Sequence, residues 1–86
     1  MIKYVYANYK QIYYDLTERG KNRATDTSEC YERHHIVPRC LGGDDSAVNM
    51  TTLTCREHFL AHWLLTRIYT DNRKIVYAFL CMLRDP

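Results

Sequence analysis

The sequence predicts a small α+β fold in which a β-hairpin and its following helix lie between an N-terminal and a C-terminal helix. Residues 3–20 and 54–70 carry apolar side chains at helical spacing, and two short strand-like stretches separated by turn residues lie between them. The chain has 86 residues, a length that suits one small domain. We therefore expect a single domain over residues 1–86, with its core at residues 30–70.

The first element is an amphipathic helix within residues 1–20. One apolar face recurs at helical spacing: Val5, Tyr9, Ile12 and Leu16. Gly20 follows this face and is a candidate C-cap. Three tyrosines lie beside the stripe, where packing against a core is the commoner role and stacking on bases is the alternative: Tyr6, Tyr13 and Tyr14.

A polar loop over residues 21–29 leads into a predicted hairpin with a long connection. Residues 30–37 read as a strand that ends at Pro38. The run Gly-Gly-Asp-Asp-Ser at 42–46 is turn chemistry, and residues 49–53 form a candidate second strand.

Two helices are predicted after the hairpin. Thr54 and Glu57 match a T-x-x-E capping box, so a helix should begin here and run to about Thr70. Its apolar stripe comprises Leu60, Leu64 and Ile68, widened by Phe59 and Trp63. Asp71-Asn72 then breaks the chain and caps a C-terminal helix over residues 72–84, whose apolar side holds Ile75, Val76, Phe79, Leu80 and Leu83.

Composition excludes some classes of protein. A formal charge of +2 is too weak to establish a nucleic-acid partner, although it does not oppose one. No stretch is long and apolar enough to cross a bilayer, and the N-terminus does not resemble a signal peptide. We therefore expect a cytoplasmic protein with no membrane partner. Its four cysteines should be reduced, with a secreted disulfide frame as the alternative: Cys30, Cys40, Cys55 and Cys81.

The four histidines suggest a metal centre. His58 and His62 are four residues apart on a predicted helix and project from one face. His34, on the strand, can supply a third imidazole and leave the open coordination position that a catalytic metal requires. His35 would then be free of the metal, and a neutral imidazole is a suitable general base at neutral pH.

Two further side chains can support these histidines. The side-chain carbonyl of Asn49 can accept a hydrogen bond from one ring nitrogen of His35; a plain turn residue is the alternative. Glu32 lies two residues before His34, on the same strand face, and can hold the distal N–H of a histidine. An exposed carboxylate is the alternative for Glu32.

The order of these residues resembles the HNH endonuclease motif. The pattern E-x-H-H-I-x-P, then G-G, N, L and E-H-x-x-x-H, covers residues 30–66. The resemblance implies a ββα-metal finger that clasps one divalent ion. By position, it implies that His34, His58 and His62 are metal ligands, that His35 is the general base and that Asn49 orients it. The flanking helices look like those of phage-borne HNH proteins of the homing-endonuclease type, which act in a bacterial host cell.

The expected function is metal-dependent hydrolysis of DNA phosphodiester bonds, with the ion at the scissile phosphate. Histidine at the first ligand position is similar to the colicin-type site, whereas other members carry aspartate there and prefer magnesium. Three neutral imidazoles favour zinc, nickel or cobalt on affinity, and Mg²⁺ or Mn²⁺ is the alternative for activity.

DNA should be bound mostly through its phosphate backbone, because no element resembles a sequence-reading helix. Candidate phosphate contacts are Arg33, Arg39 and Arg56, with ordinary surface charge as the alternative. Targeting would then come from a homodimer or a separate partner, and the alternative is that the chain is the nuclease part of a larger protein. The alternative function is a non-catalytic, metal-stabilised nucleic-acid- or protein-binding module of phage origin, which a fourth protein ligand to the metal would favour.

Overall fold

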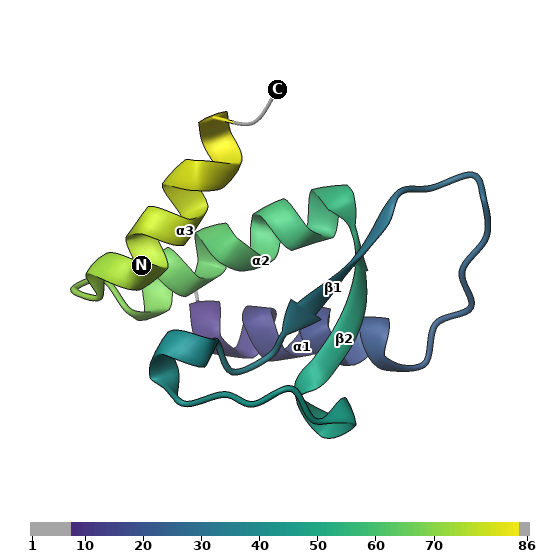
Figure 1. Cartoon of the computed structure of the whole chain (residues 1–86), viewed down its shortest axis with the longest axis horizontal. Coiled ribbons are helices and arrows are strands. Elements are labelled where there is room, and N and C mark those ends of the chain that lie inside the picture. The colour runs from purple at the N-terminus through teal and green to yellow at the C-terminus, as the bar shows by residue number, and fades with distance from the viewer. Residues whose placement is uncertain (1–7, 85–86) are drawn as a thin grey trace, which may run out of the picture.

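The predicted order of helix, hairpin and two helices is confirmed (Figure 1). The structure, a computed structural model, describes residues 8–84. Its helices and strands are α1 (Tyr9–Lys21), β1 (Tyr31–His35), β2 (Met50–Thr54), α2 (Cys55–Ile68) and α3 (Arg73–Arg84). Val5 and Tyr6, assigned from sequence to the first helix, lie outside the described residues.

Helix α1 begins at a side-chain cap and lies close against β2. The Oδ1 atom of Asn8 accepts a hydrogen bond of 3.0 Å from the backbone N–H three residues later. The prediction that Gly20 caps the helix is wrong, because the helix continues to Lys21 and its C-cap is Asn22. A Cβ at position 20 would overlap the carbonyl oxygen of Thr52, so glycine allows the helix to approach the strand closely.

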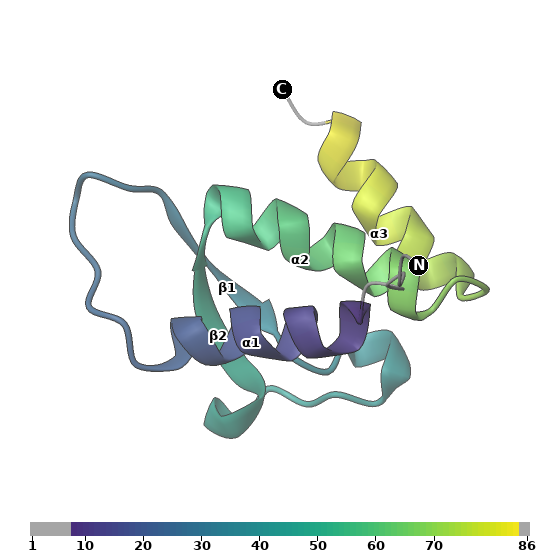
Figure 2. The same cartoon turned by 180° about the vertical axis from the view of Figure 1, so that it is seen from behind.

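The two strands pair antiparallel and divide the adjacent histidines between two faces. His34 lies opposite Thr51, and His35 lies opposite Met50. His34 and Thr51 are each 3 % exposed, because their face of the hairpin is covered by the helices. Helices α1 and α2 lie side by side and both pack against the hairpin, as two opposite views of the molecule show (Figures 1 and 2).

Helix α2 begins with the predicted capping box. Thr54 Oγ1 accepts a hydrogen bond of 3.1 Å from the Glu57 backbone N–H, and Glu57 Oε1 accepts one of 2.9 Å from the Thr54 N–H. This reciprocal pair satisfies two backbone donors that a helix start would otherwise leave free.

The structure contains a disulfide between Cys30 and Cys55, whereas the sequence predicted reduced cysteines. Strand pairing explains their proximity: the next pair along the ladder is Tyr31 with Thr54, which leaves the two cysteine Cα atoms 5.6 Å apart. The prediction of reduced cysteines rested on an expected compartment and held no information about this geometry. Cys40 and Cys81 are free thiols.

The core lies between α1, the hairpin and α2. It comprises Tyr13, Leu16, Leu53, Ala61, Leu64, Leu65 and Ile75. The buried face of α2 is therefore centred on Ala61, Leu64 and Leu65, and three residues of the predicted stripe are more than a third exposed: Phe59, Leu60 and Trp63.

Helix α3 packs on α2 and projects away from the hairpin (Figure 1). Asn72 caps it as predicted, since its Oδ1 accepts a hydrogen bond of 3.1 Å from the Ile75 N–H. Ile75 is buried, but Leu80 and Leu83 of the predicted apolar side are exposed. Among residues 8–84, no helix combines the length and apolar character needed to cross a membrane.

Candidate metal centre

Three of the four histidine rings converge where β1 faces α2. One ring nitrogen from each of His34, His58 and His62 lies within 4.8 Å of the other two. The ring centroids are 5.1 Å apart for His34 and His58, 5.1 Å for His34 and His62, and 4.8 Å for His58 and His62. The predicted clustering of these rings is confirmed. It follows from helical spacing on α2 and from strand alternation, which turns His34 toward that helix.

A buried tyrosine determines which nitrogen of His34 is free. The Tyr13 hydroxyl lies 2.7 Å from His34 Nε2 and 2.7 Å from the Ile36 carbonyl oxygen. The carbonyl can only accept, so the single hydroxyl hydrogen must point to it. His34 Nε2–H therefore donates to the tyrosine oxygen, and the lone pair lies on Nδ1. This buried Nδ1 has no hydrogen-bond partner among residues 8–84.

Glu32 plays the equivalent part for His58. Its Oε1 lies 2.7 Å from His58 Nδ1, so the contact expected between Glu32 and a histidine is present. An ionised carboxylate only accepts hydrogen bonds, so Nδ1 carries the proton and Nε2 carries the lone pair. The two hydrogen bonds thus free one nitrogen on each of these rings.

Burial favours the neutral form of two rings of this cluster, His34 and His62. Burial, followed by the neighbouring histidines, lowers the pKa of His34 to about 3. Burial and then His58 lower the pKa of His62 to about 4, against the opposing effect of Glu32. Neutral imidazole is the form that binds metal. The buried His34 Nδ1, with the rings of His58 and His62 beside it, fits a divalent cation that accepts nitrogen ligands.

A second group of possible ligands comprises Cys30, Glu32 and Cys55. One ligand atom of each lies within 4.8 Å of the other two. Its two sulfur atoms are joined in the disulfide, and its carboxylate already accepts from His58. The histidine cluster is therefore the better candidate for a metal centre.

His35 is the last residue of β1, and it is one of the residues that line a cavity of about 280 Å³ together with the three clustered histidines. Arg39 and Lys74 line the same cavity and give it two cationic side chains. Lys74 comes from α3, which had no functional residue in the sequence analysis. This cavity is where a ligand of the cluster would lie.

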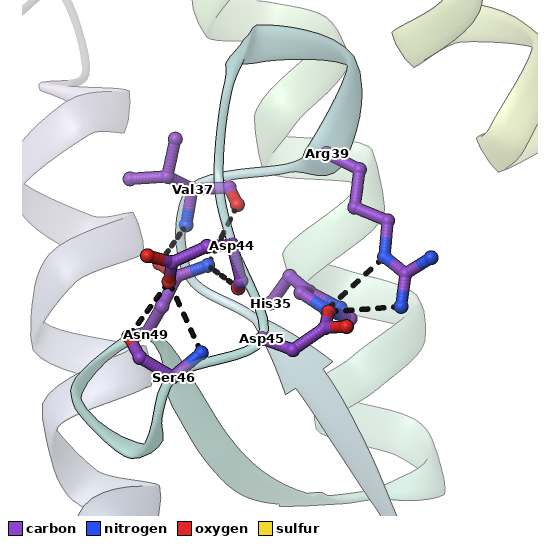
Figure 3. A network of polar contacts seen from close by, with 7 residues as sticks. All are labelled: His35, Val37, Arg39, Asp44, Asp45, Ser46 and Asn49. Atoms are coloured by element: carbon purple, nitrogen blue, oxygen red, sulfur yellow. Dashed lines mark hydrogen bonds and ion pairs between the residues drawn. The ribbon is translucent and has the colours of Figure 1, made fainter.

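A network of hydrogen bonds surrounds His35 (Figure 3). His35 Nε2 lies 2.8 Å from Asp45 Oδ1, and Arg39 Nη2 donates to the same oxygen at 2.8 Å. The hydrogen bond from His35, and then the charge of Arg39, hold the pKa of the Asp45 carboxyl below its usual range.

Asn49 does not make the predicted hydrogen bond to His35. Its Oδ1 accepts from the Val37 backbone N–H at 2.8 Å, and its Nδ2 donates to the carbonyl oxygens of Val37 at 3.0 Å and Asp44 at 2.8 Å (Figure 3). It also ends a short 3₁₀ turn, Ala47–Asn49, rather than opening the strand. Asn49 therefore joins the two ends of the loop that follows His35.

The three predicted arginine contacts are not brought together. Arg39 lines the cavity, whereas Arg33 and Arg56 are exposed and do not. Arg33 follows Glu32 and precedes His34, so alternation along the strand turns it to the opposite face. Arg56 is two residues before His58, so it lies on another side of α2.

Sequence reasoning missed three residues of the site: Tyr13, Asp45 and Lys74. Tyr13 carried a signal, because a tyrosine in a buried helical stripe needs a partner for its hydroxyl. Asp45 belongs to a turn that the sequence predicts, but the sequence does not predict the path of the backbone through that turn. Lys74 depends on how α3 packs, which no local pattern encodes.

The fold and the site define a class: a β-hairpin followed by a helix, with three convergent imidazoles as a candidate metal centre. Comparison with known proteins relates the chain to mobile endonucleases of a bacterial virus. It is 44 % identical over 75 residues to "Probable mobile endonuclease D" of Enterobacteria phage T4, and 47 % identical over 75 residues to "Probable mobile endonuclease E". It is 51 % identical over 65 residues to "Probable mobile endonuclease B" of the same phage.

These matches cover most of this chain but only part of each relative. They span 84 %, 87 % and 72 % of the chain, and 29 %, 52 % and 25 % of the D, E and B proteins. The chain thus spans about half the length of one curated relative and less than a third of the other two. No family model matches the chain, and no solved structure does.

Proposed function

We propose that the chain carries a metal-dependent endonuclease site of the HNH type, which hydrolyses phosphodiester bonds of DNA. The observation that supports this most directly is the convergence of His34, His58 and His62 beside a fourth ring, His35, which lies outside that group. The names of the phage relatives support the same class of reaction.

In this proposal the three clustered rings hold one divalent ion. When bound, the ion supplies positive charge that stabilises the scissile phosphate and its departing oxygen. Tyr13 and Glu32 hold the outward N–H groups of His34 and His58, and so fix which nitrogen of each ring faces the cation.

His35 is the proposed general base. It lines the cavity without belonging to the cluster, so its ring remains available to take a proton from an attacking water. Arg39 and Lys74 are the proposed phosphate contacts of the cavity, because both are cationic and both line it. Asn49 holds the loop after His35 and so contributes indirectly to the position of the ring.

A site of three imidazoles should bind zinc, nickel or cobalt more tightly than Mg²⁺ or Mn²⁺, and Mg²⁺ or Mn²⁺ can support activity. DNA binding would be mainly to the backbone and sensitive to salt. In the proposal the domain spans residues 1–86 and acts in a bacterial host cell. Site selection would come from a homodimer, a targeting partner or further sequence of a longer protein.

The alternative is a non-catalytic module in which the metal only stabilises the fold. Structural zinc sites usually have four protein ligands and are rich in cysteine. Within residues 8–84, the cluster offers three histidines, and the nearest cysteine group is a separate one. Three ligands and an adjoining cavity favour the catalytic interpretation.

The proposal is tested by incubating the purified chain with supercoiled plasmid after chelation, with Mg²⁺, Mn²⁺, Ni²⁺ or Zn²⁺ added back in turn. We expect nicking that depends on the metal. His35→Ala should lower the rate by about 10²- to 10⁴-fold, the usual contribution of a general base. Metal affinity should change little, because His35 is outside the cluster.

Metal binding by His35→Ala, measured in parallel, is the control for folding. Nicking at the wild-type rate by a metal-binding His35→Ala protein would contradict the assignment of the base. A wild-type chain that binds metal but cuts neither plasmid nor single-stranded DNA would favour the non-catalytic module.

A further inference from the structure

We propose that Asp45 is a positioning residue for His35, accepting the Nε2–H of its ring and so leaving the ring's lone pair on Nδ1. The catalytic consequence rests on the proposed function, in which His35 is the general base. The hydrogen-bonding claim does not, because it concerns only the geometry of the loop between the strands.

The contacts of His35 Nε2 determine its protonation. Asp45 Oδ1 lies 2.8 Å away, and Arg39 Nε lies 3.4 Å away (Figure 3). One ring nitrogen cannot donate to the carboxylate and accept from the guanidinium at the same time. The contact with Asp45 is much shorter and charge-assisted, so Nε2 carries the proton. Nδ1 is then the atom that can take a proton from water.

The loop holds Asp45 from both sides. Asp44 precedes it in the chain. The Asp44 carbonyl oxygen accepts a hydrogen bond of 2.8 Å from Asn49 Nδ2, and the Asp44 carboxylate accepts one of 3.1 Å from the backbone N–H of Ser46. Arg39 Nη2 donates to Asp45 Oδ1 at 2.8 Å. The carboxylate is thus anchored on a constrained turn even though 70 % of its side chain is exposed.

The chemistry of the pair follows from these contacts. When His35 Nδ1 takes a proton from water, an O–H bond breaks and the ring becomes a cation. The hydroxide forms a new bond to phosphorus as the bond from phosphorus to the 3′ oxygen breaks, and the departing oxygen takes a proton from solvent. Asp45 keeps its negative charge, stabilises that cation and holds the plane of the ring, as the carboxylate of a catalytic His–Asp pair does. The proton stays on the imidazole until it leaves to solvent.

The test compares Asp45→Asn and Asp45→Glu with the wild type, and uses Asp26→Asn as a matched control. Asp26, like Asp45, is an exposed aspartate in a loop and accepts a hydrogen bond through its side chain, in its case from Ser28, and its loop is outside the cavity. We expect Asp45→Asn to lower kcat for plasmid nicking by about 10- to 100-fold, as for loss of a hydrogen bond to a charged group. KM and metal affinity should not rise, Asp45→Glu should recover part of kcat, and Asp26→Asn should match the wild type.

A second readout does not depend on nuclease activity. Long-range ¹H–¹⁵N spectra of the labelled protein at alkaline pH report which ring nitrogen of His35 carries the proton. We expect the Nε2–H form in the wild type and in Asp26→Asn, and a mixture of both tautomers in Asp45→Asn.

The two proposals fail in different ways. Wild-type kcat in Asp45→Asn, under conditions where His35→Ala is inactive, would overturn the role of Asp45 and leave the nuclease proposal intact. A wild-type chain without nuclease activity would overturn the proposed function, and the spectra would still decide the contact. An Nδ1–H tautomer in the wild type would overturn the Asp45 assignment in either case.

Discussion

At the scale of single residues, the hydroxyl of Tyr13 links helix α1 to the metal cluster. It receives the Nε2–H of His34 and donates to the Ile36 carbonyl, each at 2.7 Å. Burial raises the pKa of Tyr13, so this hydroxyl stays protonated and able to donate. A helix far from the motif in sequence therefore sets the tautomer of a proposed ligand.

Tyr13→Phe should weaken both the fold and the cluster. The buried His34 N–H would lose its acceptor, which costs about 1–3 kcal/mol, and metal affinity should fall by about 10- to 100-fold. Urea unfolding of the metal-free protein and titration against a chromogenic chelator measure the two effects. Tyr14→Phe, on the exposed side of α1, is the control. Equal metal affinity in both variants would contradict the role of Tyr13.

The sequence predicted those contacts of the site that depend only on the local geometry of a strand or a helix. The clustering of the three histidines and the Glu32–His58 contact depend on strand alternation and helical spacing, which the sequence encodes. Asn49 was wrongly paired with His35, and the contact of Asp45 was missed, because both depend on the path of the loop between the strands. That path is set by tertiary hydrogen bonds that have no sequence period.

At the scale of elements, the helix starts could be predicted and their packing could not. Thr54 with Glu57 and Asn72 cap α2 and α3 as expected, because capping is a local property. Gly20 was misassigned, because its use as a close contact between α1 and β2 depends on tertiary structure. The exposed Leu60 shows the same limit: which face of α2 is buried depends on where α1 and the hairpin pack.

The disulfide between Cys30 and Cys55 should stabilise the hairpin and the start of α2. It closes a loop with a sequence separation of 25, and a loop of this size gives about 3.5 kcal/mol. A phosphine reductant should lower the urea midpoint accordingly. It should have no further effect on a Cys30→Ser, Cys55→Ser double variant, and Cys40→Ser should respond as the wild type does. An unchanged wild-type midpoint on reduction would contradict this account.

At the scale of the whole molecule, buried neutral histidines make the stability of the metal-free protein depend on pH. The pKa values of His34 and His62 are about 3 and about 4 in the folded state, against an ordinary value of 6.5. Above pH 6.5 neither state binds the extra protons, so there is no effect. Below it the unfolded chain binds protons that the folded chain does not, and the free energy of unfolding falls until about pH 3–4.

The free energy of unfolding should be lower at pH 5 than at pH 7.5 by about 2 kcal/mol for each of the two histidines, because only the unfolded chain binds these protons. Urea unfolding of the metal-free protein at steps from pH 7.5 to 5 measures it. His62→Gln should give a shallower dependence, because one of the two buried rings is gone. A constant free energy of unfolding between pH 7 and 5 would contradict neutral burial of the pair.

The proposed function depends on one property of the whole molecule: three imidazoles share one cation. X-ray absorption of the zinc-loaded chain tests it most directly, because zinc–nitrogen distances of about 2.0–2.1 Å differ from zinc–sulfur distances of about 2.3 Å. We predict one zinc ion per chain, bound by three imidazole nitrogens and one oxygen that does not come from the protein. The spectrum of this site should be lost in His62→Ala. Sulfur scatterers from Cys30 and Cys55, or an unchanged spectrum in His62→Ala, would contradict it.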